Sequence, residues 1–419
     1  MGFFRVEGGT PLVGSVRVNS AKNAVLPILA ASILTREEVT LLDSPMISDA
    51  HHMADILEIL GCQITRSGST MQIRSSELHN WEMPDSLSKQ IRSSIFLLGP
   101  ILGRFRKATV TYPGGCEIGM RPIDLHLQGL KRLGVTIREE CGLVHCDGSN
   151  MQAGDVHFDY PSVGATENVM MAAVLIPGTT TIHNAAREPE IEDLQRFINA
   201  MGGSVHGAGT NTIQVEGVKA LHGTVYRPIP DRIVAGTLLA AAAISGGQVH
   251  LDNAPVRDMV AVLTKLREMG CEIHEHIGAL DLIAPKRLNA FQQLQTQPHP
   301  GFPTDMQVQM LALAAIAKGT SIVVENVFEN RFTHAGDLNR MGANITVNGR
   351  MAIVQGVDAL YGARVNARDL RGGAALVLAG LAAQGVTEVD NVHLIDRGYE
   401  DLEGMLGSLG AKIQRIEKA

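Results

Sequence analysis

Aromatic residues are scarce in this sequence, and long apolar runs are missing. Phe, Trp and Tyr make up 4% of the 419 residues, so the hydrophobic 45% consists mostly of Ala, Val, Ile, Leu and Met. No apolar run approaches the ~18 residues of a transmembrane helix, and the N-terminus, MGFFRVEGG, lacks a basic-then-apolar signal peptide. These absences predict a cytoplasmic protein that has no membrane partner.

The motifs of common cofactor sites are also missing. The sequence contains no GxxxxGK(S/T), no GxGxxG that opens a βαβ unit, no HExxH and no CxxC pair. The net charge of −7 argues against a nucleic-acid partner, which normally requires a basic surplus. We therefore predict no metal, no redox cofactor and no nucleic-acid ligand. The cysteines, odd in number, are Cys62, Cys116, Cys141, Cys146 and Cys271.

What the chain does contain is an internal repeat. An apolar helix end, then Leu-Gly or Met-Gly, then a short β-like run recurs six times, as in LEILGCQI and LREMGCEI. Each glycine suits the left-handed residue that follows a helix and leads into a strand. The glycines lie 68 to 73 residues apart and are Gly61, Gly134, Gly202, Gly270, Gly342 and Gly410.

A second type of helix recurs between these glycines and is apolar on every side, as in DRIVAGTLLAAAAI and TDMQVQMLALAAI. Such helices are normally buried. Three repeats around their buried helices make one domain, so the sequence predicts two α/β domains. The Pro-containing segment TVYRPIPDRI suggests the boundary. We expect one domain over residues 21–229 and a second over 230–419, to which residues 1–20 return.

The starts of the buried helices carry charged and polar residues. A helix N-terminus presents unpaired N–H groups and a positive dipole end, which favour phosphate or carboxylate. If the two domains face each other through these starts, one anion-binding cleft results. The alternatives are ordinary: Lys22 and Arg92 as exposed first-turn residues, and Asp305 as a helix cap. Arg331 and Arg397 have the alternative of structural ion pairs with Glu329 and Asp396.

One cysteine departs from the repeat. Cys116 follows a Gly-Gly pair in PGGCEIGMRPIDL, and the glycines predict a mobile loop. A thiol on such a loop near arginines can act as nucleophile or acid towards an anionic substrate, although it can also be incidental to a glycine-rich turn. The other cysteines look inert, since Cys62 and Cys271 occupy the same small-residue position of the repeat.

The chain resembles a known family over essentially its whole length. The motifs NSAKNAVLPILAA, PGGCEIGMRPIDLH, SVGATEN, NAAREPEIEDL, PDRIVAG, FPTDMQ, VFENRF, RDLR and IDRGYE resemble those of the UDP-N-acetylglucosamine 1-carboxyvinyltransferases, which are enolpyruvyl transferases. The resemblance implies two inside-out α/β barrels, each of three βαβαββ repeats. It also implies transfer of the enolpyruvyl group of phosphoenolpyruvate to the 3′-hydroxyl of UDP-N-acetylglucosamine in peptidoglycan synthesis, which cell shape and division require.

The resemblance assigns roles to individual residues. Cys116 matches the acid on the loop, Asp305 the base for the 3′-hydroxyl, and Lys22 and Arg397 further catalytic residues. Cys116 also implies alkylation by the family's inhibitor fosfomycin. Those matching phosphoenolpyruvate contacts are Lys22, Asn23, Arg92, Arg121, Asp369, Arg371 and Arg397. Those matching nucleotide-sugar contacts are Asn23, Arg92, Arg121, Pro122, Asp124, Leu125, Ser162, Val163, Gly164, Asp305 and Val327.

One position departs from the family and three other functions compete. Tyr160 stands where many relatives carry lysine, so it supplies no charge to the nucleotide. The competing functions are enolpyruvyl transfer to shikimate 3-phosphate, cyclisation of RNA 3′-phosphates, and a non-catalytic six-repeat scaffold. The PGGC motif disfavours the first, the negative charge the second, and the basic helix starts the third. The oligomeric state stays open.

Overall fold

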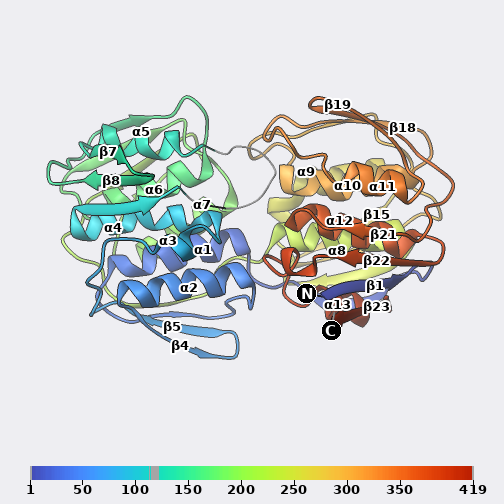
Figure 1. The fold of residues 1–419 in the computed structure, drawn as a ribbon, viewed down its shortest axis with the longest axis horizontal. Helices are drawn as coiled ribbons and strands as arrows, with labels where there is room; N and C mark the ends of the chain where they lie inside the picture. Colours follow the sequence, from blue (N-terminus) through green and yellow to red (C-terminus); the bar gives the residue numbers. More distant parts are fainter. Residues whose placement is uncertain (1, 113, 115–121, 418–419) are drawn as a thin grey trace. The chain divides into compact units, whose positions relative to one another are not determined.

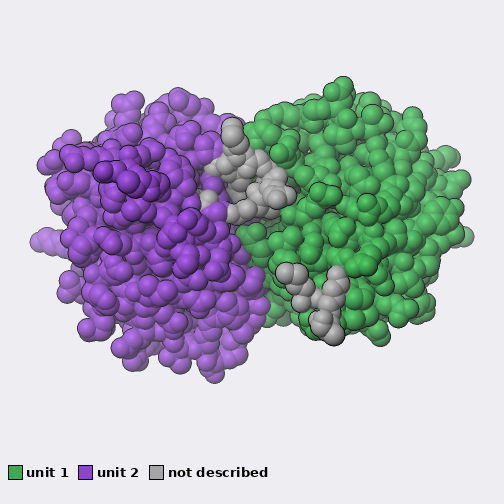
Figure 2. Space-filling view, viewed as in Figure 1, with its two compact units in different colours: residues 1–19, 117–120, 230–419 green, residues 20–116, 121–229 purple. Residues whose placement is uncertain are grey.

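The computed structural model describes residues 2–112, 114 and 122–417. The described chain forms two compact units, which Figure 2 colours separately. Unit 1 contains residues 2–19 and 230–417, and unit 2 contains residues 20–112, 114 and 122–229. Among the described residues, the chain therefore passes between the units twice, near residues 20 and 230.

The two crossing segments are hydrogen-bonded within each unit. In unit 1, Asp231 N donates to Asn19 O at 2.8 Å. In unit 2, Ala21 N donates to Ile229 O at 2.7 Å. Each unit is therefore closed by a contact between residues about 210 positions apart in the sequence.

The repeat is uninterrupted in the segment from residue 293 to 355. Its sheet has the order β17-β18-β20-β19, in which β17 is parallel to β18 and the remaining pairs are antiparallel. The buried helix α10 connects β17 to β18, and the surface helix α11 connects β18 to β19. The elements are β17 (Gln293–Gln295), α10 (Thr304–Ile316), β18 (Thr320–Val324), α11 (Ala335–Arg340), β19 (Asn344–Asn348) and β20 (Met351–Gln355).

The other two repeats of unit 1 take strands from the start of the chain. Strand β1 lies between β22 and β23 and is antiparallel to both, and β2 is parallel to β14. Their elements are β1 (Gly2–Glu7), β2 (Val13–Arg17), α8 (Arg232–Ser245), β14 (Gln248–Asp252), η3 (Val256–Met259), α9 (Val260–Glu268), β15 (Glu272–His276), β16 (Ala279–Ile283), β21 (Arg364–Asn366), α12 (Leu370–Ala382), β22 (Val386–Asp390), η4 (Val392–Leu394), α13 (Leu402–Ser408) and β23 (Lys412–Glu417).

Unit 2 repeats the same plan. Strand β13, at the end of the unit, is parallel to β3 near its beginning. In the middle repeat a single bridge between Glu82 and Thr109 replaces the edge strand. The elements are α1 (Lys22–Ala31), η1 (Ser32–Leu34), β3 (Val39–Leu41), α2 (Ser48–Leu60), β4 (Gln63–Ser67), β5 (Thr70–Arg74), α3 (Asp85–Ser88), η2 (Arg92–Leu97), α4 (Leu98–Phe105), β6 (Lys107–Thr111), α5 (Asp124–Arg132), β7 (Thr136–Glu140), β8 (Leu143–Asp147), β9 (Asp155–His157), α6 (Val163–Ala173), β10 (Thr179–His183), α7 (Pro189–Ala200), β11 (Ser204–His206), β12 (Thr212–Glu216) and β13 (Thr224–Tyr226).

The apolar helices lie inside and the sheets outside (Figure 1). In unit 1, α8, α10 and α12 contact one another, and every residue of α8 from Arg232 to Ile244 is buried. In unit 2, α6 contacts both η2 and α4, and η2 contacts α1. The structure thus confirms the predicted α/β fold of six repeats around buried helices. Among the described residues, none of the helices combines the length and apolar character needed to cross a lipid bilayer.

The six repeated glycines all follow a surface helix and have left-handed backbone, with φ from +86° to +110°. This confirms the role that their spacing predicts. At Gly410, φ is +96° and a Cβ atom would meet nothing within 4 Å, so only the backbone conformation would oppose a side chain. Gly407, inside α13, also has open space but ordinary helical backbone.

These two glycines form a matched pair for a stability test. Gly410→Ala should lower the free energy of unfolding by about 1 kcal/mol, because an L-residue is strained in left-handed backbone. Gly407→Ala should raise it by up to about 1 kcal/mol, because alanine is the better helix former. Urea unfolding of both variants checks the prediction, and equal changes for the two would contradict it.

Helix α6 carries three consecutive polar residues that are fully buried, Thr166, Glu167 and Asn168. Thr166 Oγ1 accepts from Ala186 N, whereas both carboxyl oxygens of Glu167 lack a hydrogen-bond partner among the described residues. Burial, with the nearby carboxyls of Glu190 and Glu188, holds the pKa of Glu167 well above its ordinary value. The folded protein therefore favours the protonated form.

A pH-dependent loss of stability follows for Glu167. A folded-state pKa above the unfolded one gives a contribution that is complete below the unfolded pKa, about 4.3, and is lost as pH rises through the folded pKa. Glu167→Gln should therefore raise the melting temperature more at about pH 8 than at about pH 5. Calorimetry at both pH values measures this, with Glu140→Gln, an exposed carboxyl at the end of β7, as control. An equal gain at both would refute the assignment.

Candidate active site

The first group of predicted site residues begins α1 and η2 in unit 2. Lys22 is the first residue of α1, and its Nζ lies 2.7 Å from Asp49 Oδ2 of α2, with both side chains largely buried. Asn23 follows it, and Arg92 is the first residue of η2. Because the ion pair with Asp49 fixes the Lys22 ammonium, its charge is held at the start of a buried helix.

The starts of α5 and α6 are joined by packing. Ser162 caps α6, its Oγ accepting from Ala165 N at 3.3 Å. A Cβ atom on Gly164 would lie 2.8 Å from His126 Cε1, so this backbone and the α5 side chain pack closely. Asn168 Nδ2 lies 2.8 Å from His126 Nδ1 and donates to Ile95 O of η2 at 3.0 Å. The first N–H groups of α6 are thus presented on a rigid base, as anion binding requires.

The remaining predicted residues of unit 2 lie beside these starts in the chain. Asp124 is the first residue of α5 and is exposed, Leu125 follows it half-buried, and Pro122 is exposed. Tyr160 is 44% exposed two residues before the Ser162 cap. Its ring therefore remains accessible for contact with a ligand.

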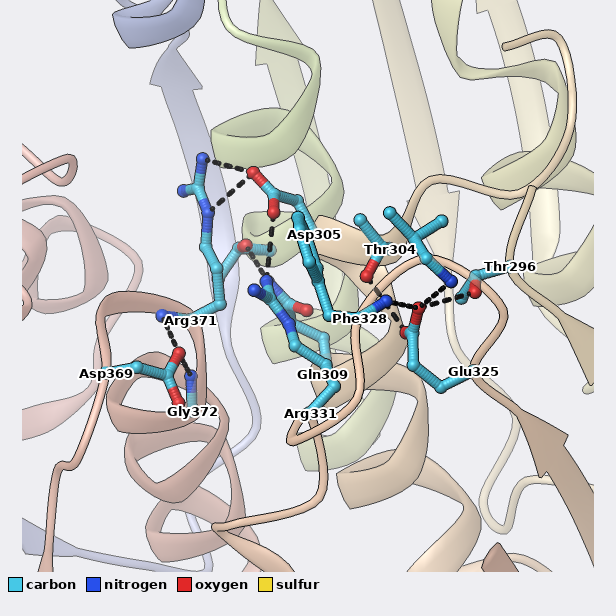
Figure 3. A network of polar contacts seen from close by, with 12 residues as sticks. Thr296, Thr304, Asp305, Gln309, Glu325, Phe328, Arg331, Asp369, Arg371 and Gly372 are labelled. Carbon is cyan, nitrogen blue, oxygen red and sulfur yellow. Dashed lines mark hydrogen bonds and ion pairs between the residues drawn. The ribbon is translucent and has the colours of Figure 1, made fainter. Parts of the chain in front are cut away.

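The second group of predicted residues lies in unit 1 and is organised around Asp305 in the first turn of α10 (Figure 3). Arg331 Nη2 donates to Asp305 Oδ1 at 2.9 Å, and Arg371 Nε and Nη2 donate to Oδ2 at 3.3 and 3.2 Å. Both arginine side chains are 3% exposed, whereas that of Asp305 is 26% exposed. Two buried guanidinium groups therefore orient a carboxylate that solvent can reach.

Arg371 is held in place by the start of α12. Asp369 caps this helix, its Oδ1 accepting from Arg371 N at 3.0 Å and Gly372 N at 2.9 Å. The Arg371 guanidinium lies over the ring of Tyr399. Burial opposes its charge, but Tyr399 and the carboxylates of Asp305 and Asp231 outweigh that effect and raise the pKa of Arg371. Arg371 is therefore a permanent cation in this site.

His334 adds a buried imidazole between two charged residues of this group. Burial lowers its pKa to about 4, with Asp369 opposing the shift and Arg331 adding to it. His334 is therefore neutral at physiological pH. Neither ring nitrogen of His334 has a hydrogen-bond partner among the described residues, and the same holds for Asp369 Oδ2 and Arg331 Nε.

The structure places the predicted residues in two groups, one in each unit. Val327 and Arg397, both half-buried, belong to unit 1 with Asp305, Asp369 and Arg371. Cys116 and Arg121 lie outside the described residues. Within the described chain, no three His, Cys, Asp or Glu residues are grouped as metal ligands would be.

One of the alternative ion pairs is not formed as the sequence suggested. Glu329 contacts Arg350 at 3.3 Å rather than Arg331. Arg331 instead binds Asp305. The family resemblance assigned no role to Arg331, His334 or Glu325, so the sequence analysis did not include them in the site.

Three of the cysteines are buried in the core. Burial raises the pKa of the Cys62, Cys146 and Cys271 thiols to about 12, so almost none is thiolate at neutral pH. Cys141 is exposed in the turn between β7 and β8.

Alkylation of the native protein should follow this division. Iodoacetamide at neutral pH should modify Cys141 and leave Cys62, Cys146 and Cys271 unmodified, because the thiolate is the reactive form. Peptide mass spectrometry after brief exposure tests this, and the same treatment in urea, where all cysteines react, is the control. Rapid labelling of any of the three in the native protein would contradict it.

Two units of three βαβαββ repeats, with cations and a carboxylate at buried-helix starts, define the architecture of the enolpyruvyl transferases. The family model described as EPSP synthase (3-phosphoshikimate 1-carboxyvinyltransferase) matches residues 6–406. The chain belongs to this family.

Its relatives within the family have a more particular name. The chain is 50% identical over 416 residues to UDP-N-acetylglucosamine 1-carboxyvinyltransferase 2 of Caldanaerobacter subterraneus subsp. tengcongensis, covering 99% of this chain and 100% of the relative. It is 51% identical over 417 residues to UDP-N-acetylglucosamine 1-carboxyvinyltransferase 1 of Symbiobacterium thermophilum, covering 98% and 94%.

Solved structures show the same fold. The enolpyruvyl transferase NikO from Streptomyces tendae superimposes with a TM-score of 0.89 at 24% identity, covering 99% of this chain and 98% of that one. An EPSP synthase from Acinetobacter baumannii gives 0.76 at 17% identity, covering both chains fully.

Proposed function

We propose that the protein transfers the enolpyruvyl group of phosphoenolpyruvate to the 3′-hydroxyl of UDP-N-acetylglucosamine and releases phosphate, as the first committed step of peptidoglycan synthesis in the cytoplasm. The observation that carries this proposal is the identity of about half of the sequence, over nearly its whole length, to enzymes of that name. The site geometry supports it independently.

The chemistry is an addition followed by an elimination. The Cys116 thiol gives a proton to C3 of phosphoenolpyruvate, which makes C2 electrophilic. The 3′-hydroxyl oxygen then bonds to C2 while Asp305 accepts its proton, and a tetrahedral ketal phosphate forms. Loss of a proton from C3 and cleavage of the C2–O bond to phosphate restore the double bond and release phosphate.

The Asp305 carboxylate suits the role of base. Arg331 and Arg371 hold both of its oxygens in one orientation, yet about a quarter of the side chain is exposed. A general base must lie within hydrogen-bond reach of the proton that it takes, and a fixed carboxylate meets this condition without reorganising.

The cations suit the two anionic ends of phosphoenolpyruvate. We assign its phosphate and carboxylate to Lys22, Arg92, Arg121, Arg371 and Arg397, because guanidinium groups bind such anions with two parallel hydrogen bonds. Asn23 and Asp369 complete this set. The N–H groups at the start of α6, from Ser162 to Gly164, would receive the diphosphate. Since these residues belong to both units, we propose that both units contact the substrates.

Transfer to 3-phosphoshikimate is the second candidate, because the matching family model is described by that reaction. The solved EPSP synthase is 17% identical, whereas the nucleotide-sugar enzymes are about 50% identical. The difference favours the nucleotide sugar as acceptor.

Phosphate release from phosphoenolpyruvate tests the acceptor and the acid together. Wild type should release phosphate with UDP-N-acetylglucosamine and not with 3-phosphoshikimate, and Cys116→Ser should lose on the order of 10²-fold or more in kcat, the usual contribution of a general acid. Release with the nucleotide sugar that survives the mutation would remove Cys116 from the chemistry. Release only with 3-phosphoshikimate would overturn the proposed function.

A further inference from the structure

Glu325 is a fully buried carboxylate at the end of β18 (Figure 3). Its Oε1 accepts from Thr296 Oγ1 at 2.8 Å and from the backbone N–H groups of Val327 and Phe328 at 2.8 and 3.1 Å. Its Oε2 accepts from Thr304 Oγ1 at 2.9 Å. One carboxylate thus joins the segment that carries Val327 to the start of α10, where Thr304 precedes Asp305.

Three sister repeats achieve the same turn with an amide. In each of these three the residue directly after the strand is an asparagine in left-handed backbone, with φ of +52° at Asn184, +56° at Asn253 and +62° at Asn391. Each side-chain amide donates to the carbonyl just beyond the edge strand, at 2.8 Å to Phe158 O, 2.8 Å to Val18 O and 3.2 Å to Ala367 O.

The repeat that contains Glu325 departs from this pattern by one residue. Glu325 occupies the position directly after the strand and does not share the left-handed backbone. The amide contact is made one residue later, by Asn326 Nδ2 to Thr296 O at 3.2 Å. Three sister repeats close the turn without an acid at this position. The contacts of Glu325 end at the backbone N–H of Val327 and at Thr304, the residue before Asp305.

We propose that Glu325 is a positioning residue that sets the nucleotide-sugar contact at Val327 and the base at Asp305 in a fixed relation to each other. The proposal rests on the proposed function, because those two roles come from it. The Glu325 side chain is fully buried, so it acts through other residues. Glu325 makes two sets of hydrogen bonds, which we call its arms. The loop arm joins it to Thr296 and to the amides of Val327 and Phe328, and the helix arm joins it to the Thr304 hydroxyl.

Charge and geometry predict different effects for different substitutions. A buried carboxylate that accepts four neutral hydrogen bonds is stable only while those donors remain, and removing it leaves them unpaired. Gln at position 325 keeps one oxygen for the loop donors, and its amide can donate to the Thr304 hydroxyl, which accepts as well as donates. Ala keeps neither arm.

The test is steady-state kinetics with UDP-N-acetylglucosamine and phosphoenolpyruvate. Glu325→Ala should raise KM for the nucleotide sugar and lower kcat, each by about tenfold, while Glu325→Gln stays within about threefold of wild type. Loss of each arm should change a different kinetic parameter. Thr296→Val should raise KM for the nucleotide sugar, and Thr304→Val should lower kcat. Hydrogen exchange at the amides of residues 327 and 328 should be faster in Glu325→Ala without any substrate.

The matched control is Asn253→Gly, which removes the equivalent turn contact in a sister repeat of the same unit and tolerates its positive φ. It should lower the melting temperature and leave kcat and KM unchanged. If Glu325→Ala only lowers the melting temperature in the same way, the residue is structural and the proposal is wrong.

Failure of the proposed function gives a different result. Wild type would then show no sugar-dependent phosphate release. Hydrogen exchange at the amides of residues 327 and 328 would still test whether Glu325 holds the loop. If Glu325→Ala does not fold, the two threonine variants still test the arms, and an identical effect of both on kcat and KM would overturn the proposal.

Discussion

The structure depends on helices that are buried on nearly every side, as α6, α8, α10 and α12 are. Such a helix is stable only when it is covered all round, so each unit packs three of them together and places its sheets outside. This arrangement leaves the helix ends as the places where polar groups can reach solvent. The chemistry of the molecule is therefore concentrated at helix starts, where Lys22, Ser162, Asp305 and Asp369 lie and where the positive end of the helix dipole favours anions.

The two groups of site residues differ in how they hold charge. In unit 2, Lys22 is paired with one buried aspartate, and Arg92 and the backbone at the start of α6 are the further anion-binding groups proposed there. In unit 1, two buried arginines share one carboxylate. This second arrangement fixes the shared carboxylate in one orientation, which suits proton transfer.

A repeat protein offers an internal comparison that a single-copy fold lacks. Where all copies share a feature, such as the left-handed glycine after each surface helix, the feature serves the fold. Where one copy differs, a local function is the simplest physical reason, because the sister copies show that the fold does not require the change. Cys116 differs from the other repeats in sequence, and Glu325 differs from three sister repeats in its contacts.

The sequence alone was sufficient for the class of fold, and it named most of the residues that remain candidates for the site. Helix periodicity and the glycine spacing are local properties, so Gly61 to Gly410 and the buried helices could be read directly, and the family motifs selected Asp305 and Arg371. The ion-pair and hydrogen-bond partners of the charged residues could not be predicted from the sequence, because contacts between distant segments set them. The nearest acid to Arg331 in the chain is Glu329, yet Arg331 pairs with Asp305, 26 residues away. Glu325 accepts a hydrogen bond from Thr296, 29 residues away. Only tertiary packing decides those pairs, since burial of a charge selects the partner with the best geometry rather than the one nearest in sequence.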